Sequence, residues 1–302
     1  MEQHQNLTAR LQAAGIACRE QEPLAAHTTF KIGGPAAVFV QPADEAQLCQ
    51  AVRLCRELAV PCYLLGNGSN ILFGDRGYAG AVVSLAGMKG EVRREGDTLT
   101  APAGMPLSVL CTAALRAGLT GLEFAYGIPG TVGGAVYMNA GAYGGEMKDV
   151  LLSVRYLTAE GQIEEAPAAE LDLGYRHSVF ESNGGCILSA AVRLAPGNPE
   201  AIAARMDDLM GRRRDKQPLD KPSAGSTFKR PVGAFAGALI EQCGLRGYRH
   251  GGAAISEKHC GFVVNLGGAT CADVLALCAE VQKIVKDQTG FTLEKEIRVV
   301  EL

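Results

Sequence analysis

Apolar residues recur at helical spacing in several parts of the chain. After Asp44, which can cap a helix, Leu48, Val52 and Cys55 fall at i, i+4 and i+7 and so share one helical face. The same kind of spacing predicts a long helix over residues 271–288. Shorter patterns predict further helices over residues 4–14, 107–117, 200–213 and 235–243.

Short apolar runs between these helices predict strands. The runs alternate with the helices and show no internal repeat, which indicates a mixed α and β chain. The predicted strands cover residues 36–40, 62–65, 81–85, 152–158, 186–194, 226–229 and 291–302.

Two polar stretches divide the chain. Residues 89–97 are rich in charge, and residues 215–222 are polar and contain two prolines, so both are typical of connections between compact parts. A length of 302 residues also exceeds the ~150 of an average domain. We therefore expect compact segments at residues 1–88, 89–214 and 215–302.

Composition excludes several classes of protein. A hydrophobic fraction of 47% is sufficient for a large core, and a net charge of −3 gives no positive excess for binding nucleic acid. No stretch approaches the ~18 consecutive apolar residues of a membrane helix. Residues 1–5 lack the basic and apolar regions of a signal peptide. We expect a cytoplasmic protein that binds neither nucleic acid nor membrane.

The ten cysteines are scattered and form no CxxC pair, and the five histidines are equally dispersed. Several cysteines fall on apolar helix faces, as Cys55 does. We therefore expect buried thiols in a reducing compartment and no metal site.

Glycine is the unusual feature of the composition. The 38 glycines amount to nearly twice the average of ~7%, and they are clustered. The run Gly66-Asn67-Gly68-Ser69-Asn70 follows a predicted strand, where backbone N–H groups could cradle a pyrophosphate. Ile71 occupies the position of the third glycine in G-x-G-x-x-G, so the dinucleotide fingerprint does not fit. A tight turn explains this run equally well.

A second glycine-rich stretch, residues 127–143, carries almost no charge. Glycine and alanine at this density leave the backbone bare, which suits a large flat ligand, although an irregular loop packed on itself is the alternative. Two such stretches, each next to strands, favour a bound cofactor.

These runs, together with three later ones, resemble the UDP-N-acetylenolpyruvoylglucosamine reductase (MurB) family. The resemblance extends from about Thr28 to the C-terminus. The motifs that carry it, in order, are residues 65–70, 128–134, 139–143, 174–180, 224–231 and 293–298.

The resemblance implies an α+β protein with a two-part FAD-binding fold of the vanillyl-alcohol-oxidase type and a C-terminal α+β substrate domain. It implies that NADPH reduces a non-covalently bound FAD, which then reduces UDP-N-acetylglucosamine enolpyruvate to UDP-N-acetylmuramate for peptidoglycan. The residues expected to bind FAD are Gly66, Asn67, Gly68, Ser69, Asn70, Gly127, Ile128, Pro129, Gly130, Gly133, Gly134, Asn139, Ala140, Gly141, Ala142 and Tyr143.

The resemblance also implies three catalytic residues. Ser226 is expected to protonate the enolate, Arg176 to hold the carboxylate with its bidentate guanidinium, and Glu296 to share a proton with the enol or stabilise it. Taken alone, Ser226 would be a turn residue and Arg176 a surface arginine. Glu294 lies two residues from Glu296 on a predicted strand and points the same way, so sequence geometry does not choose between them.

Four residues are candidate anchors for the nucleotide sugar: Lys216, Lys229, Arg230 and Asn265. One branch of the family has asparagine where Arg230 stands, and the chain is short for an inserted loop over the substrate. We therefore place it in the compact branch.

Two other functions fit part of the sequence. Another flavoenzyme of the same superfamily would explain the glycine-rich runs, but not Ser226 and Glu296 within their motifs. A nucleotide-sugar-binding protein without activity would keep the fold and would not take up FAD.

Overall fold

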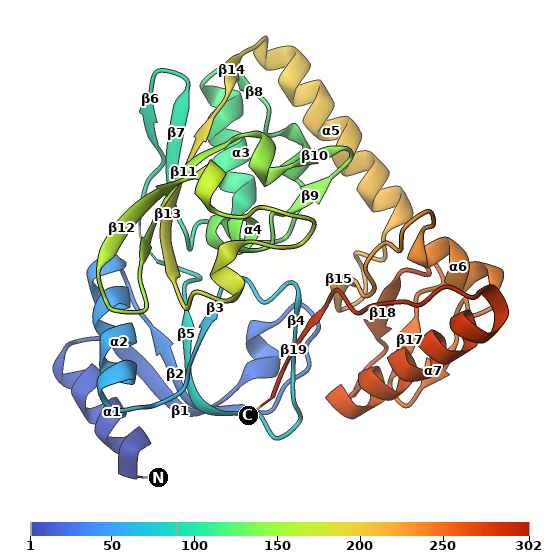
Figure 1. The fold of residues 1–302 in the computed structure, drawn as a ribbon, viewed down its shortest axis with the longest axis horizontal. Coiled ribbons are helices and arrows are strands. Elements are labelled where there is room, and N and C mark those ends of the chain that lie inside the picture. The colour runs from blue at the N-terminus through green and yellow to red at the C-terminus, as the bar shows by residue number, and fades with distance from the viewer. Residues whose placement is uncertain (1, 89, 302) are drawn as a thin grey trace. The chain divides into compact units, whose positions relative to one another are not determined.

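A computed structural model describes residues 2–88 and 90–301. The chain forms two compact units (Figure 1). The first unit contains the chain up to Glu20, Val38–Asn67 and Ala81–Arg213, and the second contains Gln21–Ala37, Gly68–Gly80 and the chain from Arg214 on. The change of unit after Arg213 lies one residue before the predicted boundary at 214/215, while the boundary at 88/89 stays a prediction.

The first sheet has the strand order β1-β2-β5-β3. Its strands are β1 (Ala17–Pro23), β2 (Pro35–Gln41), β5 (Tyr78–Ser84) and β3 (Cys62–Leu65). β3 pairs with β5 in parallel, and Gly66 follows directly at the carboxyl end of β3. The pattern after Asp44 is confirmed as helix α2 (Glu45–Glu57), since the Asp44 side chain accepts a hydrogen bond from Gln47 N and Leu48, Val52 and Cys55 are buried.

A second, antiparallel sheet forms the rest of the first unit's framework. Its order is β12-β11-β13-β7-β6, in which β11 (Leu151–Leu157) and β13 (Cys186–Arg193) confirm two predicted strands. The other strands of this sheet are β12 (Ile163–Pro167), β7 (Thr98–Pro102) and β6 (Arg93–Glu95). Two further two-stranded sheets are formed by β8 (Leu119–Thr120) with β14 (Ala195–Pro196), and by β9 (Gly141–Ala142) with β10 (Gly145–Glu146).

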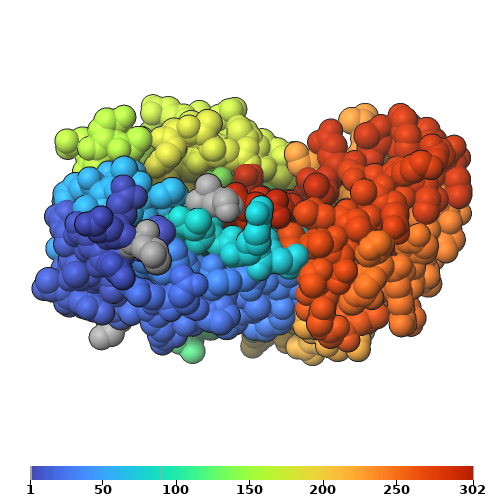
Figure 2. All heavy atoms as spheres, turned by 90° about the horizontal axis from the view of Figure 1, so that it is seen from below, coloured from blue at the N-terminus to red at the C-terminus, as the bar shows by residue number. Residues whose placement is uncertain are grey.

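Three more predicted helices of this unit are present: α1 (Glu2–Ala13), α3 (Leu107–Arg116) and α5 (Pro199–Lys216). α1 buries only Leu7 and Leu11, and Figure 2 shows it in dark blue at the surface of the unit. α5 continues past Arg213, so the first residues of the predicted connection at 215–222 are helical.

Part of the second glycine-rich stretch is a helix, α4 (Val132–Tyr137), where the sequence predicted a loop. Glycine disfavours helices, but packing outweighs propensity here. Thr131 caps the helix by accepting a hydrogen bond from Gly134 N (3.2 Å). A Cβ on Gly133 would lie 2.8 Å from Ala103 Cβ, so only glycine lets the helix approach the end of β7 so closely.

The second unit contains a sheet of order β15-β18-β17-β16 and a pair formed by β4 (Ile71–Phe73) and β19 (Arg298–Val300). The sheet strands are β15 (Ser223–Ser226), β18 (Phe262–Asn265), β17 (Ala253–Ile255) and β16 (Arg249–His250). The helices α6 (Ala236–Gln242) and α7 (Cys271–Thr289) confirm two predictions. The C-terminal strand is shorter than predicted, and the strand predicted over 226–229 ends at Ser226 instead.

Cysteines are a regular part of both cores. Seven of the ten are buried, and burial raises the pKa of the Cys111 and Cys186 thiols to about 12. These thiols therefore pack as small hydrophobic groups. Among the described residues, no three His, Cys, Asp or Glu side chains are grouped to hold a metal ion, and no described helix is long and apolar enough to span a membrane.

Candidate active site

Two segments that the sequence assigned to FAD meet in the first unit. Asn67 Nδ2 donates a hydrogen bond to the Pro129 carbonyl (2.7 Å), which ties the residues after β3 to the loop before α4. A Cβ on Gly66 would lie 2.7 Å from Thr131 Oγ1. The two loops therefore pass so closely that the bare backbone of Gly66 is required. The remaining residues of the first loop, Gly68, Ser69 and Asn70, belong to the second unit.

Gly133 and Gly134 have different surroundings although they are adjacent. Gly133 is buried against Ala103, so its missing side chain serves the packing of α4. Gly134 is exposed, and the nearest atom to a Cβ placed there is Thr131 Oγ1 at 3.4 Å. Only Gly134 leaves backbone open for a ligand.

Arg213 provides a test of whether this loop fits a cofactor. Its Nη1 donates to the Gly127 carbonyl (2.5 Å), while its Nε is buried and is the one buried side-chain nitrogen or oxygen among the described residues without a hydrogen-bond partner. A buried N–H without an acceptor is costly, so this geometry indicates that an acceptor arrives with a ligand. FAD carries phosphate and carbonyl oxygens that could accept this hydrogen bond, so Arg213 and the loop residues fit a bound FAD.

The sequence assigned no cofactor role to Arg213. It lies in the run 212–216, which reads as a solvated helix end or a site for a diphosphate, and no spacing singles it out.

The expected FAD residues 139–143 form the entry to a hairpin. β9 and β10 pair through Ala142 and Gly145, and the turn residues Tyr143 and Gly144 both have positive φ, as a two-residue hairpin turn requires. Tyr143 is exposed at this turn. Asn139 is fully buried and its side chain bonds only to protein groups, so any contact of Asn139 with a cofactor is left to its backbone.

Arg176 lies at the tip of a tight turn in the first unit, residues 174–177, called the Arg176 turn below. Gly174 and His177 exchange both backbone hydrogen bonds (3.1 and 3.3 Å), and Arg176 adopts a left-handed φ of 56° between them. Its guanidinium carbon lies 5.1 Å from the centroid of the Tyr175 ring, and its Nη2 is 3.4 Å from the Gly141 carbonyl. The turn therefore presents a cation on a strained, well-defined backbone.

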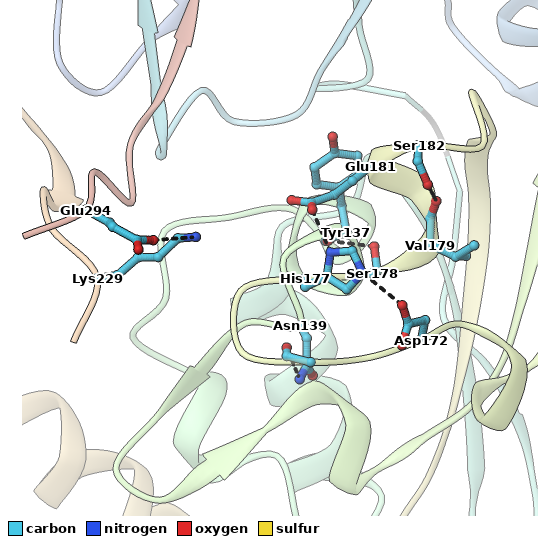
Figure 3. A network of polar contacts seen from close by, with 11 residues as sticks. Tyr137, Asn139, Asp172, His177, Ser178, Val179, Glu181, Ser182, Lys229 and Glu294 are labelled. Carbon is cyan, nitrogen blue, oxygen red and sulfur yellow. Dashed lines mark hydrogen bonds and ion pairs between the residues drawn. The ribbon is translucent and has the colours of Figure 1, made fainter. Parts of the chain in front are cut away.

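The stem of this turn is anchored by side chains (Figure 3). Ser178 is fully buried and its Oγ donates to the Tyr137 carbonyl (2.7 Å) at the end of α4. The His177 ring bridges two carboxylates, with Nδ1 2.6 Å from Glu181 Oε2 and Nε2 3.1 Å from Asp172 Oδ2. These contacts fix the chain both before the turn, at Asp172, and after it, at His177 and Ser178.

Ser226 and Glu296 lie on neighbouring segments of the second unit. Glu296 N donates to the Thr227 carbonyl (2.8 Å), so the two segments are joined one residue beyond Ser226. Thr227 is buried and its Oγ1 accepts from Val263 N (2.9 Å), while the next residue back, Ser226, is half-buried. The Ser226 hydroxyl takes part in none of the side-chain hydrogen bonds that the structure describes among residues 2–88 and 90–301.

The structure also distinguishes Glu296 from Glu294. Lys229 N donates to the Glu294 carbonyl (2.8 Å), and Lys229 Nζ lies 3.7 Å from Glu294 Oε2, whose side chain is 73% exposed. Glu296 is opposite Thr227 and half-buried, and its carbonyl accepts from Asn70 Nδ2 (3.2 Å). Of the two acids, Glu296 is thus the one whose backbone adjoins Thr227, and the side chain of Asn70 from the first glycine-rich run bonds to its carbonyl.

The four predicted substrate anchors are spread over the second unit. Lys216 is exposed at the end of α5, and the Arg230 guanidinium carbon lies 4.5 Å from the centroid of the Phe235 ring. Asn265 is buried and uses its amide to accept from Gly267 N and Ala269 N and to donate to the Phe30 carbonyl. Of the four, Asn265 thus also has a structural role.

Comparison with known proteins gives this arrangement a class. Residues 36–166 match the FAD binding domain family, and residues 217–300 match the C-terminal domain of UDP-N-acetylenolpyruvoylglucosamine reductase. The chain is therefore an FAD-binding oxidoreductase with an α+β fold, as predicted.

Similarity over the whole length makes the assignment more specific. The chain is 49% identical over 283 residues to the UDP-N-acetylenolpyruvoylglucosamine reductase of Lachnoclostridium phytofermentans, covering 92% of this chain and 91% of that one. The corresponding reductase of Clostridioides difficile is 48% identical over 279 residues, with 92% of each covered. The crystal structure of the Thermus caldophilus reductase superposes with a TM-score of 0.79 at 36% identity, over 95% of this chain and 99% of that one. This chain belongs to the UDP-N-acetylenolpyruvoylglucosamine reductase family.

Proposed function

We propose that the protein uses NADPH to reduce UDP-N-acetylglucosamine enolpyruvate to UDP-N-acetylmuramate in peptidoglycan synthesis. The observation that carries the proposal is that the chain segments of Ser226 and Glu296 adjoin. Both lie within the C-terminal family match, and the hydrogen bond from Glu296 N to the Thr227 carbonyl joins their segments. A hydroxyl donor and a carboxylate on adjoining segments suit reduction of an enol ether better than oxidation of an alcohol.

The glycine-rich loops of the first unit and Arg213 would hold FAD. Bound there, FAD would supply the hydride chemistry of the reaction, taking hydride from NADPH and passing it to the methylene carbon of the enolpyruvyl ether. The loops bring no histidine or cysteine to this cofactor, because residues 66–70 and 127–143 contain neither, so the attachment is non-covalent. The chain's contribution at this position is a bare backbone and a buried donor on Arg213.

Arg176 acts on the substrate carboxylate in this proposal. Hydride addition at the methylene carbon shifts negative charge onto the neighbouring carbon and its carboxylate. A guanidinium offers two parallel N–H donors to a carboxylate and keeps its charge throughout. The left-handed backbone of the Arg176 turn fixes that cation before the charge develops, which is the condition for strong electrostatic stabilisation.

Ser226 and Glu296 complete the reaction on the carbon that becomes protonated. The Ser226 hydroxyl donates its proton to the carbon next to the carboxylate, and Glu296 shares the proton of the developing enol. Serine is a weak acid, so its contribution depends on position. Its place beside the buried Thr227, which is fixed by Val263 N and Glu296 N, supplies that position.

The nucleotide part of the substrate is assigned to Lys216, Lys229, Arg230 and Asn265. Three of these carry positive charge that a diphosphate requires. The exposed position of Lys216 and the placement of the Arg230 guanidinium on an aromatic ring support this assignment.

A single-turnover experiment tests the proposed reaction. Photoreduced protein is mixed anaerobically with UDP-N-acetylglucosamine enolpyruvate, and flavin absorbance is followed. We expect reoxidation by this compound and none by UDP-N-acetylglucosamine or simple alcohols. Reoxidation by an alcohol-derived carbonyl compound, with no response to the enolpyruvyl sugar, would assign the chain to a different flavoenzyme activity.

A further inference from the structure

Asn139 adopts a backbone conformation that favours glycine. It follows α4 with φ of 39°, while Asn139 N bonds to the Val136 carbonyl (2.9 Å) and Ala140 N bonds to the Ala135 carbonyl (2.8 Å). These two bonds define a Schellman motif with Asn139 at the left-handed position. Asparagine is the usual alternative to glycine at this position, so the contacts of its side chain decide whether it has a further role.

The Asn139 side chain joins three segments of the first unit. Nδ2 donates to Glu146 Oε2 (2.8 Å) and to the Gly174 carbonyl (2.9 Å), and Oδ1 accepts from Lys148 N (2.9 Å). Asn139 itself is fully buried and these bonds are partly buried; Figure 3 shows Asn139 below the His177 ring. Hydrogen bonds in such a setting fix geometry strongly, because losing one leaves a buried group unsatisfied.

The bond to Gly174 reaches the base of the Arg176 turn. Gly174 is the residue whose backbone pairs with His177 across the turn, and Arg176 is held between them in a left-handed conformation. The position of the Gly174 carbonyl therefore sets where the arginine side chain begins. Gly141, whose carbonyl lies 3.4 Å from Arg176 Nη2, is two residues from Asn139 on the other side.

We propose that Asn139 is a positioning residue for Arg176, acting through the Gly174 carbonyl. This inference rests on the proposed function, in which Arg176 holds the substrate carboxylate. It assigns to the Asn139 side chain a role in the reduction of substrate and not in the binding of FAD.

Asn139→Gly separates the side chain from the backbone. Glycine is the favoured residue at the left-handed position, so the end of α4 is preserved and only the amide bridge is lost. We expect the variant to bind FAD and to be reduced by NADPH at nearly the normal rate. Flavin reoxidation by UDP-N-acetylglucosamine enolpyruvate should slow by up to about 10²-fold, the effect of a small misplacement of a catalytic group.

A double variant tests whether the effect passes through Arg176. Arg176→Ala should slow reoxidation by on the order of 10²–10³. If Asn139 acts through Arg176, Asn139→Gly combined with Arg176→Ala is no slower than Arg176→Ala alone. The matched control is Lys148→Ala. It breaks the surface ion pair of Lys148 Nζ with Glu146 Oε1 (2.7 Å) but keeps the backbone N–H of residue 148, which donates its hydrogen bond to Asn139 Oδ1. This control should leave both half-reactions unchanged.

The outcomes separate the two hypotheses. If Arg176→Ala reoxidises as fast as wild type, the proposed role of Arg176 is wrong. If Arg176→Ala is slow but Asn139→Gly matches wild type, or if the two effects multiply in the double variant, the positioning role of Asn139 is overturned. Loss of FAD from Asn139→Gly would also overturn it, because the side chain would then serve the cofactor site.

Discussion

The proposed proton donor, Ser226, and the proposed acid, Glu296, are both held through backbone contacts at Thr227. Ser226 precedes a buried threonine, and Glu296 is bonded through its own N–H to that same threonine. Main-chain geometry therefore sets where both side chains begin, and removing the half-buried Ser226 hydroxyl breaks none of the side-chain hydrogen bonds that the structure describes among residues 2–88 and 90–301.

Ser226→Ala is expected to keep FAD, keep reduction by NADPH and keep most of the affinity for the UDP-sugar. The half-buried hydroxyl leaves no charge behind when it is removed. Reoxidation by UDP-N-acetylglucosamine enolpyruvate should fall by roughly 10²–10⁴, the usual contribution of a positioned general acid. Ser226→Cys should restore part of the rate. Stopped-flow absorbance measures both half-reactions, and a change of only a few-fold for Ser226→Ala would remove Ser226 from the mechanism.

Glu296 and Glu294 offer a matched pair of substitutions. Glu296→Gln should slow flavin reoxidation by roughly 10²–10⁴ because a group that shares a proton is lost. Glu294→Gln should have little effect, since Glu294 is exposed and its pairing with Lys229 at 3.7 Å is a weak surface contact. Comparable losses in the two variants, measured in the same single-turnover assay, would contradict the assignment.

The sequence alone was most informative where a short motif contains the residue types that the proposed reaction needs. The two-residue ambiguity between Glu294 and Glu296 is a limit of strand geometry, and the backbone bond from Glu296 to Thr227 favours Glu296 without deciding it. The sequence did not indicate Arg213 as a candidate cofactor contact, because its unsatisfied buried nitrogen appears only once α5 lies beside Gly127 in the folded structure. The amide of Asn139 is a similar case, since its partners lie up to 35 residues away along the chain.

At the scale of elements, α4 connects packing with ligand binding. Its first turn has one glycine packed against Ala103 and one glycine that is exposed. The helix was predicted as a loop, because glycine propensity dominates a reading of local sequence, whereas the close approach of Ala103 decides the structure. Helices with an apolar stripe are easier to predict, because burial of the stripe determines them: α2 starts directly after the predicted cap Asp44, and α7 matches its predicted range to one residue.

Opposite stability effects are expected from alanine at the two glycines of α4. Gly133→Ala should destabilise the fold by about 1–3 kcal/mol through overpacking against Ala103, measured by denaturant unfolding without FAD. Gly134→Ala should stabilise it by up to about 1 kcal/mol through helix propensity. The added methyl group at Gly134 should nevertheless weaken FAD binding at least tenfold, or about 1.4 kcal/mol, by titration. Unchanged FAD affinity of Gly134→Ala would exclude the exposed face of α4 from the cofactor site.

At the scale of the whole molecule, the two units are assembled from separated stretches of chain. The sequence predicted consecutive segments, since polar connections are the only boundaries that a linear pattern displays. The structure groups Gln21–Ala37 and Gly68–Gly80 with the chain from Arg214 on, while the predicted boundary at 88/89 stays a prediction. Hydrogen bonds over long sequence distances, such as Asn70 Nδ2 to the Glu296 carbonyl, hold the second unit together and leave no local signal in the sequence.

Non-covalent FAD should stabilise the folded protein by mass action. At a free FAD concentration of 100 times Kd, the free energy of unfolding should rise by about 2.7 kcal/mol, which a thermal melt with and without added FAD detects. Acid precipitation should release all flavin into the supernatant, because residues 66–70 and 127–143 contain no histidine or cysteine for attachment. Colour retained in the pellet would contradict a non-covalent cofactor.

The parallel pairing of β4 with β19 has a consequence for synthesis on the ribosome. Asn70, next to β4, and Glu296, next to β19, are 226 residues apart along the chain. At about 5–20 residues per second, the nascent β4 segment waits about 10–45 s before its partner emerges. During that interval Ile71, Leu72 and Phe73 form an apolar strand without its partner, which makes the nascent chain a candidate client for chaperones.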